Sequence, residues 1–341
     1  MPLSFHPGRR TLYVAAESSE GTFIGAATLF AVGKATLPTE SLKFDPVVDF
    51  HDRRTDGPSA QSIRSIPGAQ KATISFTSRL VGSNSAGVAG VLSDLLKTCM
   101  TETISAGTSV EYTWNENSMA RLSLGWGIIR DDGGIELEHA IAGAGLQKVV
   151  IHADDKGKPI MCDWTFLGKI AYETSIVVEL DDATPNTSII YVDDFAKGFT
   201  FKGLTVRSGI LSRSISKFSL EISNKGELGT DVSDASCYDW FHNGVCDVTL
   251  KADAAKTTAG AAPDIANLVS GAQASAAFTV SNAAGATFTL TLPNLQPKKL
   301  SEGSRDGGNI STWDIEAEAH RTADGSTAQA SDAFKLTFGH T

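Results

Sequence analysis

Paired carboxylates are the residues of this chain whose type and spacing could do chemistry. Four acidic doublets occur, at Asp131-Asp132, Asp154-Asp155, Asp181-Asp182 and Asp193-Asp194. Such pairs can serve glycoside hydrolysis or bind Ca²⁺. All four lie at predicted strand ends or turns, where local hydrogen bonds to the backbone favour Asp. We therefore interpret the doublets as turn residues, with a metal site and a hydrolase site as the alternatives.

Other sequence patterns of catalysis or cofactor binding are absent. The chain has no Walker phosphate loop and no Gly-x-Ser-x-Gly elbow, and its seven His residues form no metal-ligand cluster. Cys99, Cys162, Cys237 and Cys246 show no CxxC spacing, so we expect small buried thiols. A reducing cytosol would disfavour a disulfide between Cys237 and Cys246. The sequence predicts no enzyme, no cofactor and no metal.

Composition points to an ordinary globular protein with an acidic surface. Hydrophobic residues make up 41% and charged residues 20% of the 341 residues, and the formal net charge is −10. An acidic balance argues against gripping nucleic acid through its phosphates, but it does not argue against a protein that lets DNA pass without sticking. No apolar run approaches the ~18–20 residues that cross a bilayer, and no signal-peptide core is present. We expect no membrane partner and assembly in a cytoplasm.

Alternating apolar and polar residues along the chain predict many strands and few helices. We predict an amphipathic helix at 88–99 with its apolar stripe against a sheet, and a short helix at 261–270 with Pro263 near its first turn. Residues 44–68 mix Pro, Gly and charge without periodicity, which predicts a long loop or arm. The predicted strands are 72–81, 109–114, 121–130, 135–141, 147–153, 160–167, 215–222, 246–252, a hairpin at 277–292, and 333–338.

A block near the middle of the chain returns near its end. Residues 146–166 resemble residues 295–315, so that Gln147 matches Gln296 and Trp164 matches Trp313, both at an offset of 149. The upstream stretch IELEHAI resembles ATFTLTL with two residues of slippage, and chance is the alternative reading. Because a chain of this length usually divides into domains, we predict two tandem domains, 1–170 and 171–341.

Two segments resemble the tail tube proteins of long-tailed bacteriophages. PGAQKATISFTSRLVGSNSAGVAGVLSDLLKTC (67–99) is similar to their opening strand, Gly/Ser loop and Leu-rich helix. TFTLTLPNLQPKKLSEGSRDGGNISTWDIEAEAH (287–320) is similar to their C-terminal strands. The resemblance implies an all-β fold with minor α content: two tandem β-sandwich or barrel-like domains, each with a flanking short helix.

The resemblance also implies a structural virion protein that forms stacked rings around a DNA conduit. Three two-domain chains would close a ring with pseudo-sixfold symmetry, and six chains are the alternative. DNA would pass through without specific binding, and the other partners would be the tape measure, terminator and distal tail proteins. The chain would reside in the phage tail after assembly in the host bacterial cytoplasm.

Site residues follow as expectations. Glu136 and Glu138, with Thr287 and Thr289 at equivalent places, are candidates for the polar face of a lumen-lining strand. The N-terminal arm with Arg9 and Arg10, and the 44–68 loop with Asp52, Arg53 and Arg54, are candidates for contacts between stacked rings. The alternatives are another tail ring component, or a carbohydrate-binding β-sandwich that stacks sugars on Trp114, Trp126, Trp164 or Trp313.

Overall fold

The structure is a computed structural model of the chain. It describes residues 5–25, 28–29, 40–51, 66–83, 85–90, 92–130, 135–171, 198–256, 261–320 and 331–340. Most of these residues are strand, and the helices are the short α2 (Ser93–Lys97), α3 (Ala261–Ser270) and a 3₁₀ turn η1 (Gly209–Ser212). The predicted all-β class with minor helical content is confirmed.

The strands fall into two sets along the chain. The first set is β1 (Phe5–Ala16), β2 (Glu40–His51), β3 (Ile66–Arg79), β4 (Met100–Ser105), β5 (Ser109–Trp114), β6 (Leu122–Arg130), β7 (Ile135–Ala153) and β8 (Met161–Ile170). The second set is β9 (Thr205–Ser208), β10 (Ile215–Asn224), β11 (Glu227–Thr230), β12 (Tyr238–His242), β13 (Cys246–Ala255), β14 (Ala274–Ser281), β15 (Ala286–Arg305), β16 (Ile310–His320) and β17 (Ser331–His340).

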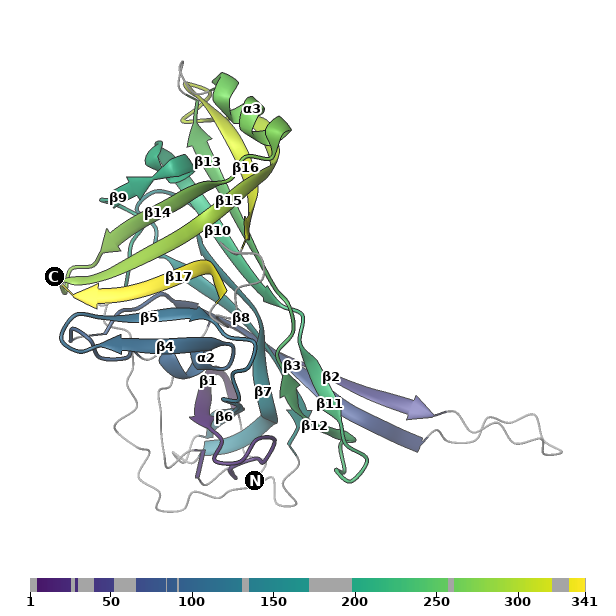
Figure 1. The fold of residues 1–341 in the computed structure, drawn as a ribbon. Coiled ribbons are helices and arrows are strands. Elements are labelled where there is room, and N and C mark those ends of the chain that lie inside the picture. Colours follow the sequence, from purple (N-terminus) through teal and green to yellow (C-terminus); the bar gives the residue numbers. More distant parts are fainter. Residues whose placement is uncertain are drawn as a thin grey trace.

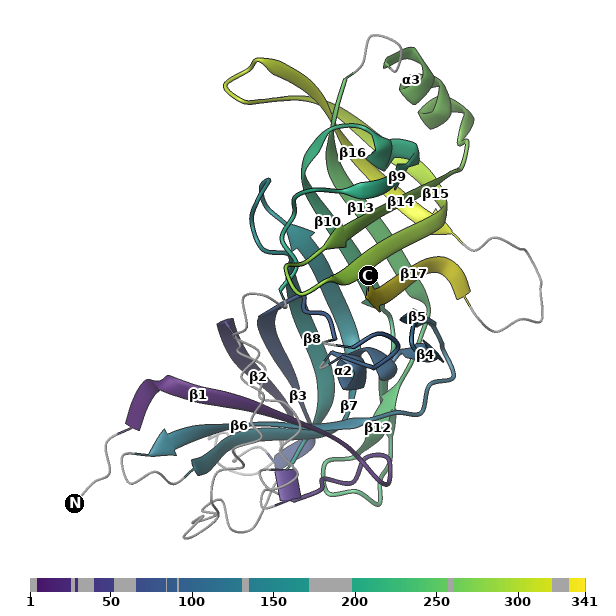
Figure 2. The same cartoon turned by 90° about the vertical axis from the view of Figure 1, so that its left-hand side faces the viewer.

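Eight of these strands are consecutive neighbours in a 15-stranded sheet, in the order β2-β3-β8-β7-β10-β13-β16-β15, and we call this antiparallel run the long sheet (Figure 1). Apolar and polar side chains alternate along its strands, because one face of the sheet covers the core. On β3, for example, Ile74 and Phe76 are buried while Ser75 and Thr77 are half-exposed on the opposite face. The strands β4, β5, β14 and β17 and the helix α2 lie on the core side, and β1 and β6 cross the foot of the sheet (Figure 2).

The long strands β7 and β15 each belong to two parts of the sheet. The first half of β7 pairs with β6 and its second half with β8 and β10. In the same way, β15 pairs first with β14 and β17 and then with β16. Gly143, at φ +60°, lies where β7 changes partners, which is a conformation that other residues rarely adopt. The two strands predicted at 135–141 and 147–153 are therefore one bent strand.

The same connectivity occurs twice along the chain. In chain order, the first set runs β1, β2, β3, α2, β6, β7, β8, and its sheet order is β1-β6-β7-β8-β3-β2. The second set runs β9, β10, β13, α3, β14, β15, β16, and its sheet order is β9-β14-β15-β16-β13-β10. The hairpins β4–β5 and β11–β12 and the last strand, β17, are additions to this shared plan.

Strand register makes the correspondence specific to the residue. Leu146 faces Phe166 and Lys148 faces Thr165, with a register shift between the two pairs. At positions 151 residues later, Pro297 faces Ala317 and Lys299 faces Glu316, with the same shift. The offset is thus 151, as in the slipped upstream stretch, and the matches at 149 between Gln147 and Gln296 and between Trp164 and Trp313 were wrong by two residues.

The two sets share strand ladders and a core. β7 pairs with β10, and β17 at the C-terminal end pairs with β5 of the first set. One cluster of buried residues extends through both, from Leu12 to Phe338. The predicted division at residue 170 therefore remains a prediction. Of the predicted long loop, residues 44–51 and 66–68 are strand and form an arm that projects from the body (Figure 1), whereas 52–65 lie outside the described residues.

Candidate functional site

The face of the long sheet that points away from the core carries polar side chains in rows across the strands. One row, defined by directly opposed residues, is Arg79, Met161, His152, Ser219, Lys251, Glu316 and Lys299. The next is Thr77, Asp163, Val150, Glu221, Thr249, Glu318 and Gln296. A third is Ser75, Thr165, Lys148, Ser223 and Asp247. We call these three rows the polar face.

Opposite charges are paired along the polar face. Lys148 Nζ lies 3.0 Å from Glu221 Oε2, and Lys251 Nζ lies 4.0 Å from Glu316 Oε2. His152 also lies near a carboxylate, with Nε2 3.2 Å from Asp163 Oδ2. Hydroxyl groups fill many of the places between the charges, so this surface has neither a column of unpaired cations nor a continuous acidic stripe.

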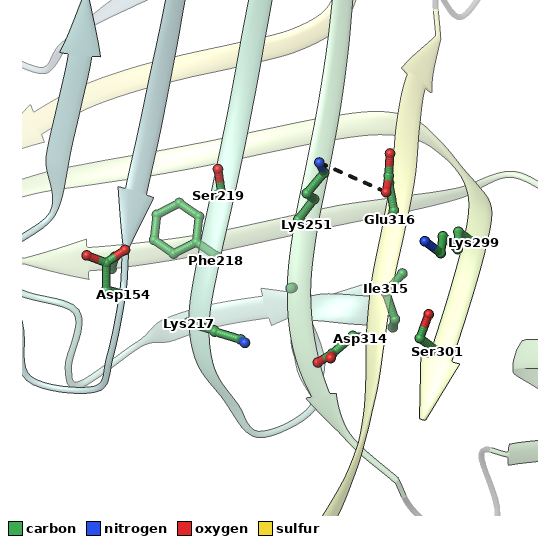
Figure 3. Close-up of a pocket in the computed structure, with 12 residues that line it drawn as sticks. Asp154, Lys217, Phe218, Ser219, Lys251, Lys299, Ser301, Asp314, Ile315 and Glu316 are labelled. Atoms are coloured by element: carbon green, nitrogen blue, oxygen red, sulfur yellow. Dashed lines mark ion pairs between the residues drawn. The ribbon is translucent and has the colours of Figure 1, made fainter. Parts of the chain in front are cut away.

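A shallow pocket of about 430 Å³ lies on this face where β10, β13, β16 and β15 run side by side. Figure 3 shows Lys217, Lys251 and Lys299 around it together with Asp314 and Glu316. Its apolar floor comes from edges of Phe218 and Ile315, whose side chains are otherwise buried. Asp154 also lines the pocket, so three amines and three carboxylates surround it and their formal charges balance.

The β11–β12 hairpin covers one end of the polar face. Phe241 is fully buried and, with Leu228, packs against Leu167 of β8. Lys169 Nζ lies 2.5 Å from Asp234 Oδ2 at the same place. Burial raises the pKa of Asp234, but hydrogen bonds from Lys169 and Ser236 outweigh it and hold the pKa below its usual value. The hairpin thus fastens the second set of strands onto the first.

A buried amide completes this junction. Asn224, at the end of β10, donates from Nδ2 to Leu146 O of β7 and to Asn243 Oδ1, each at 2.9 Å. Its Oδ1 accepts hydrogen bonds from the backbone N–H groups of Gly226 and Gly244. Asn243 in turn donates to Thr98 O just after α2. Every polar atom of the Asn224 side chain is satisfied, as a buried amide requires.

The predicted lumen residues lie on the shorter pairings of the two bent strands. Thr287 and Thr289 are half-buried in β15 opposite Ser281 and Thr279 of β14, and the hydroxyls of Thr279 and Thr289 are 2.8 Å apart. Glu136 and Glu138 belong to β7 where it pairs with β6. The structure therefore places the two pairs on corresponding hairpins and not in the rows of the polar face. Their role in lining a lumen remains a prediction.

The predicted stacking residues are only partly described. Arg9 and Arg10 lie in β1, so the N-terminal arm is a strand paired with β6. Asp52, Arg53 and Arg54 fall outside the described residues. Sequence reasoning missed the polar face as a whole, although the alternation of Thr73, Ser75 and Thr77 was its visible signal.

Other predicted features have simpler roles. Trp114, Trp164 and Trp313 are all buried, which fits core packing and leaves these rings no surface on which to stack a sugar. Asp154 and Asp155 are exposed in a turn, and Asp155 Oδ1 accepts the N–H of Lys156. Cys99 and Cys162 are buried, whereas Cys237 and Cys246 are partly exposed, and no disulfide joins the four. Among the described residues, no group of three or more Asp, Glu, His or Cys side chains could hold a metal ion.

The described residues form an all-β protein with a polar sheet face and with strand edges at β2 and β15 that have no partner strand among those residues, and such edges can pair with another chain. The family model for the phage tail tube protein matches residues 8–331, and this chain belongs to that family. It is accordingly a structural protein of the phage tail. No curated protein is similar enough in sequence to count as a match. None of the helices in the described ranges is long and apolar enough to span a membrane.

Proposed function

We infer that this chain is the major tail tube subunit, whose copies form rings that stack into a hollow conduit for phage DNA. Membership of the tail tube family supports this role. Assembly would take place in the bacterial cytoplasm, alongside the tape measure, terminator and distal tail proteins. The chain would work mechanically, without a cofactor and without catalysis.

The observation that carries the ring proposal is the doubled connectivity. Two sets of strands have the same order in the chain and in the sheet, which supports the two tandem units predicted at 1–170 and 171–341. If each unit takes one sixth of a turn, three chains close a ring with pseudo-sixfold symmetry, because successive rotations must sum to a full circle. A ring of six such chains would contain twelve units.

The eight-stranded sheet sets the size of such a ring. Three copies would contribute twenty-four strands to one closed wall. With strands ~4.8 Å apart and tilted by ~40°, opposite backbones would lie roughly 45–50 Å apart. After side chains are allowed for, this wall leaves room for a DNA duplex. Closure would also leave no sheet edge free to aggregate.

The polar face would then line the lumen. The core side of the sheet is covered by α2, β5, β14 and β17, so in the described part of the chain the polar face is the broad side left for the inner surface. Paired charges such as Lys148–Glu221, together with rows of hydroxyls, present no array of cations that would hold phosphates through counterion release. Glu136, Glu138, Thr287 and Thr289 would add to this surface where β7 and β15 bend.

Stacking of one ring on the next would use the projecting segments. The β2–β3 arm extends beyond the body of the protein (Figure 1), and it leads to Asp52, Arg53 and Arg54. The β1 strand carries Arg9 and Arg10 near the foot of the sheet. Contacts between charged side chains at a surface are screened by salt, and salt should therefore weaken the stacking.

Imaging and mass measurement of the purified chain test the proposal. We expect stacked rings with a central hole, and a mass of three chains for the smallest closed ring by native mass spectrometry. A chain that stays monomeric at high concentration would contradict the role as tube subunit. Rings of six chains would leave that role standing and overturn the two-unit ring.

A further inference from the structure

Within the described residues, two strand edges lack in-chain partners where their counterparts have them. β10 pairs with β13 on one side and with β7 on the other, over residues 218–223 and 148–153. Its counterpart β2 pairs only with β3. The counterpart of 148–153 is 299–304 of β15, which pairs only with β16 over that stretch. Within the described part of the chain, the edge that β2 leaves open therefore matches the edge that β15 leaves open.

Register assigns the counterparts residue by residue. Leu146 and Phe166 correspond to Pro297 and Ala317 at an offset of 151. Phe166 faces Ile74 on β3, and Ala317 faces Leu250 on β13, which matches Ile74 with Leu250.

One strand further, Ile74 faces Phe44 of β2 while Leu250 faces Leu220 of β10. The offset between β2 and β10 is thus 176. By the same step, Asp45 corresponds to Glu221, and Val47 to Ser223.

An ion pair crosses the junction between β7 and β10 within the chain. Lys148 of β7 and Glu221 of β10 approach to 3.0 Å, and both are partly exposed on the polar face. Lys148 corresponds to Lys299, and Glu221 to Asp45. A lysine on one open edge and a carboxylate on the other therefore occupy the matching positions. Within one chain Asp45 is paired with Lys43 at 2.7 Å, in an exposed pair of the kind that contributes little to stability.

We propose that β2 of one chain adds antiparallel to residues 299–304 of β15 in a second copy, in the register of the β7–β10 junction, with Asp45 paired to Lys299 of that copy. This inference rests on the ring proposed above and supplies its contact. Directly opposed residues would be Val47 and Lys299, and Pro46 and Leu300, since Ser223 faces Lys148 and Ile222 faces Val149 in the existing junction.

The core side of the open β15 edge also favours β2 of a second copy as its partner. A pocket of about 160 Å³ lies there, with Ile210, Leu295 and Leu300 among its lining residues. At the β7–β10 junction within the chain, the corresponding side chains are Val149 and Ile222, which fill this level with 0% and 1% of their surface exposed. Pro46, which is exposed in the single chain, would lie over Leu300 and help to exclude water from the pocket. Pro46 also suits an edge strand, because it removes one donor and so limits pairing with unrelated strands.

Charge reversal on the full-length protein tests the register. We expect Asp45→Lys and Lys299→Asp each to raise the critical concentration for ring and tube assembly by roughly tenfold, because one attraction per interface becomes a repulsion. The double variant should restore assembly. Glu221→Lys is the matched control, since it reverses the same charge at the covalently tethered junction and should leave assembly near the wild-type level.

Cysteine pairing provides a test that does not depend on charge. In the proposed register, Val47→Cys with Lys299→Cys places two thiols directly opposite each other, ~4.5–5.5 Å apart at Cα. Mild oxidation should give covalent rings that end at three chains, and neither single variant should. Tubes that form normally with Asp45→Lys and do not crosslink would overturn the register while leaving the tube role intact. Failure of the wild-type chain to form rings would instead overturn the role itself.

Discussion

Docking of the β11–β12 hairpin depends on a glycine that leaves room for a phenyl ring. A Cβ atom added at Gly145 would lie 2.1 Å from Cδ1 of Phe241, whereas carbon atoms in contact stay ~3.5–4.0 Å apart. The ring is fully buried and cannot swing into solvent, so the hairpin itself must move by roughly 1.5 Å. Gly145→Ala should therefore loosen the contact that fastens the second set of strands onto the first.

The expected loss is about 2–3 kcal/mol in the free energy of unfolding. Overpacking in a core typically costs ~1–3 kcal/mol, and this site is fully enclosed. The direction of the change is informative, because a protein with glycine inside a strand is ordinarily less stable than the same protein with alanine there, by ~0.5–1 kcal/mol. Gly90→Ala is the matched control: the nearest atom to its added Cβ lies at 3.6 Å, and we expect a change within about 0.5 kcal/mol.

Urea unfolding followed by circular dichroism measures these differences, and limited proteolysis of residues 225–245 reports whether the hairpin stays docked. Phe241→Ala alone should cost ~3–5 kcal/mol. Combined with Gly145→Ala, the total should be at least about 1 kcal/mol below the sum, because the clash disappears with the ring. A Gly145→Ala protein as stable as wild type, or strictly additive costs, would refute the packing argument.

Two further predictions concern buried polar contacts. Ser78→Ala should destabilise the protein by about 1–3 kcal/mol in urea unfolding, because Trp164 Nε1 donates a hydrogen bond to Ser78 Oγ at 2.8 Å inside the core. Ser75→Ala on the polar face is the control and should change the free energy of unfolding by less than about 0.5 kcal/mol. Equal effects of the two substitutions would contradict the assignment of the two faces of β3. Asp234 has a pKa below its usual value, so its contribution is complete above its unfolded pKa of ~3.9 and is lost as the pH falls through the folded value. Below about pH 4 the wild type should thus lose stability more steeply than Asp234→Asn, and parallel pH profiles would contradict this.

Local patterns in the sequence predicted the elements that carry their own signal. The strand at 109–114 and the helix at 261–270 match β5 and α3 in both bounds. The helix predicted at 88–99 is shorter, since α2 begins at Ser93, after Gly87 and Gly90. Strand β2 was read as loop because Pro46 and scattered charges hide its alternation, which is common at a sheet edge. Alternation and helical periodicity are properties of residues close together in the chain, so they can be read from the sequence without knowing the fold.

The candidate site depends on register, which one sequence does not contain. Lys148 and Glu221 are 73 positions apart in the chain and meet only because β7 pairs with β10. The sequence repeat was visible, but its offset was assigned as 149 because Trp164 and Trp313 match by type. The ladders place Ile315, not Trp313, at the position of Trp164, since both units share the same register shift after Leu146 and Pro297. Bulges decide the register, and side-chain identity alone does not reveal them.

A three-dimensional reconstruction of one ring, from tubes of the wild-type chain, would show how many chains close the ring and which strands meet between them. We expect threefold symmetry, an inner wall of twenty-four strands with the polar face inward, and β2 of each chain beside β15 of the next. A ring with six chains, or an inner wall in which β2 and β15 are not neighbours, would contradict this expectation.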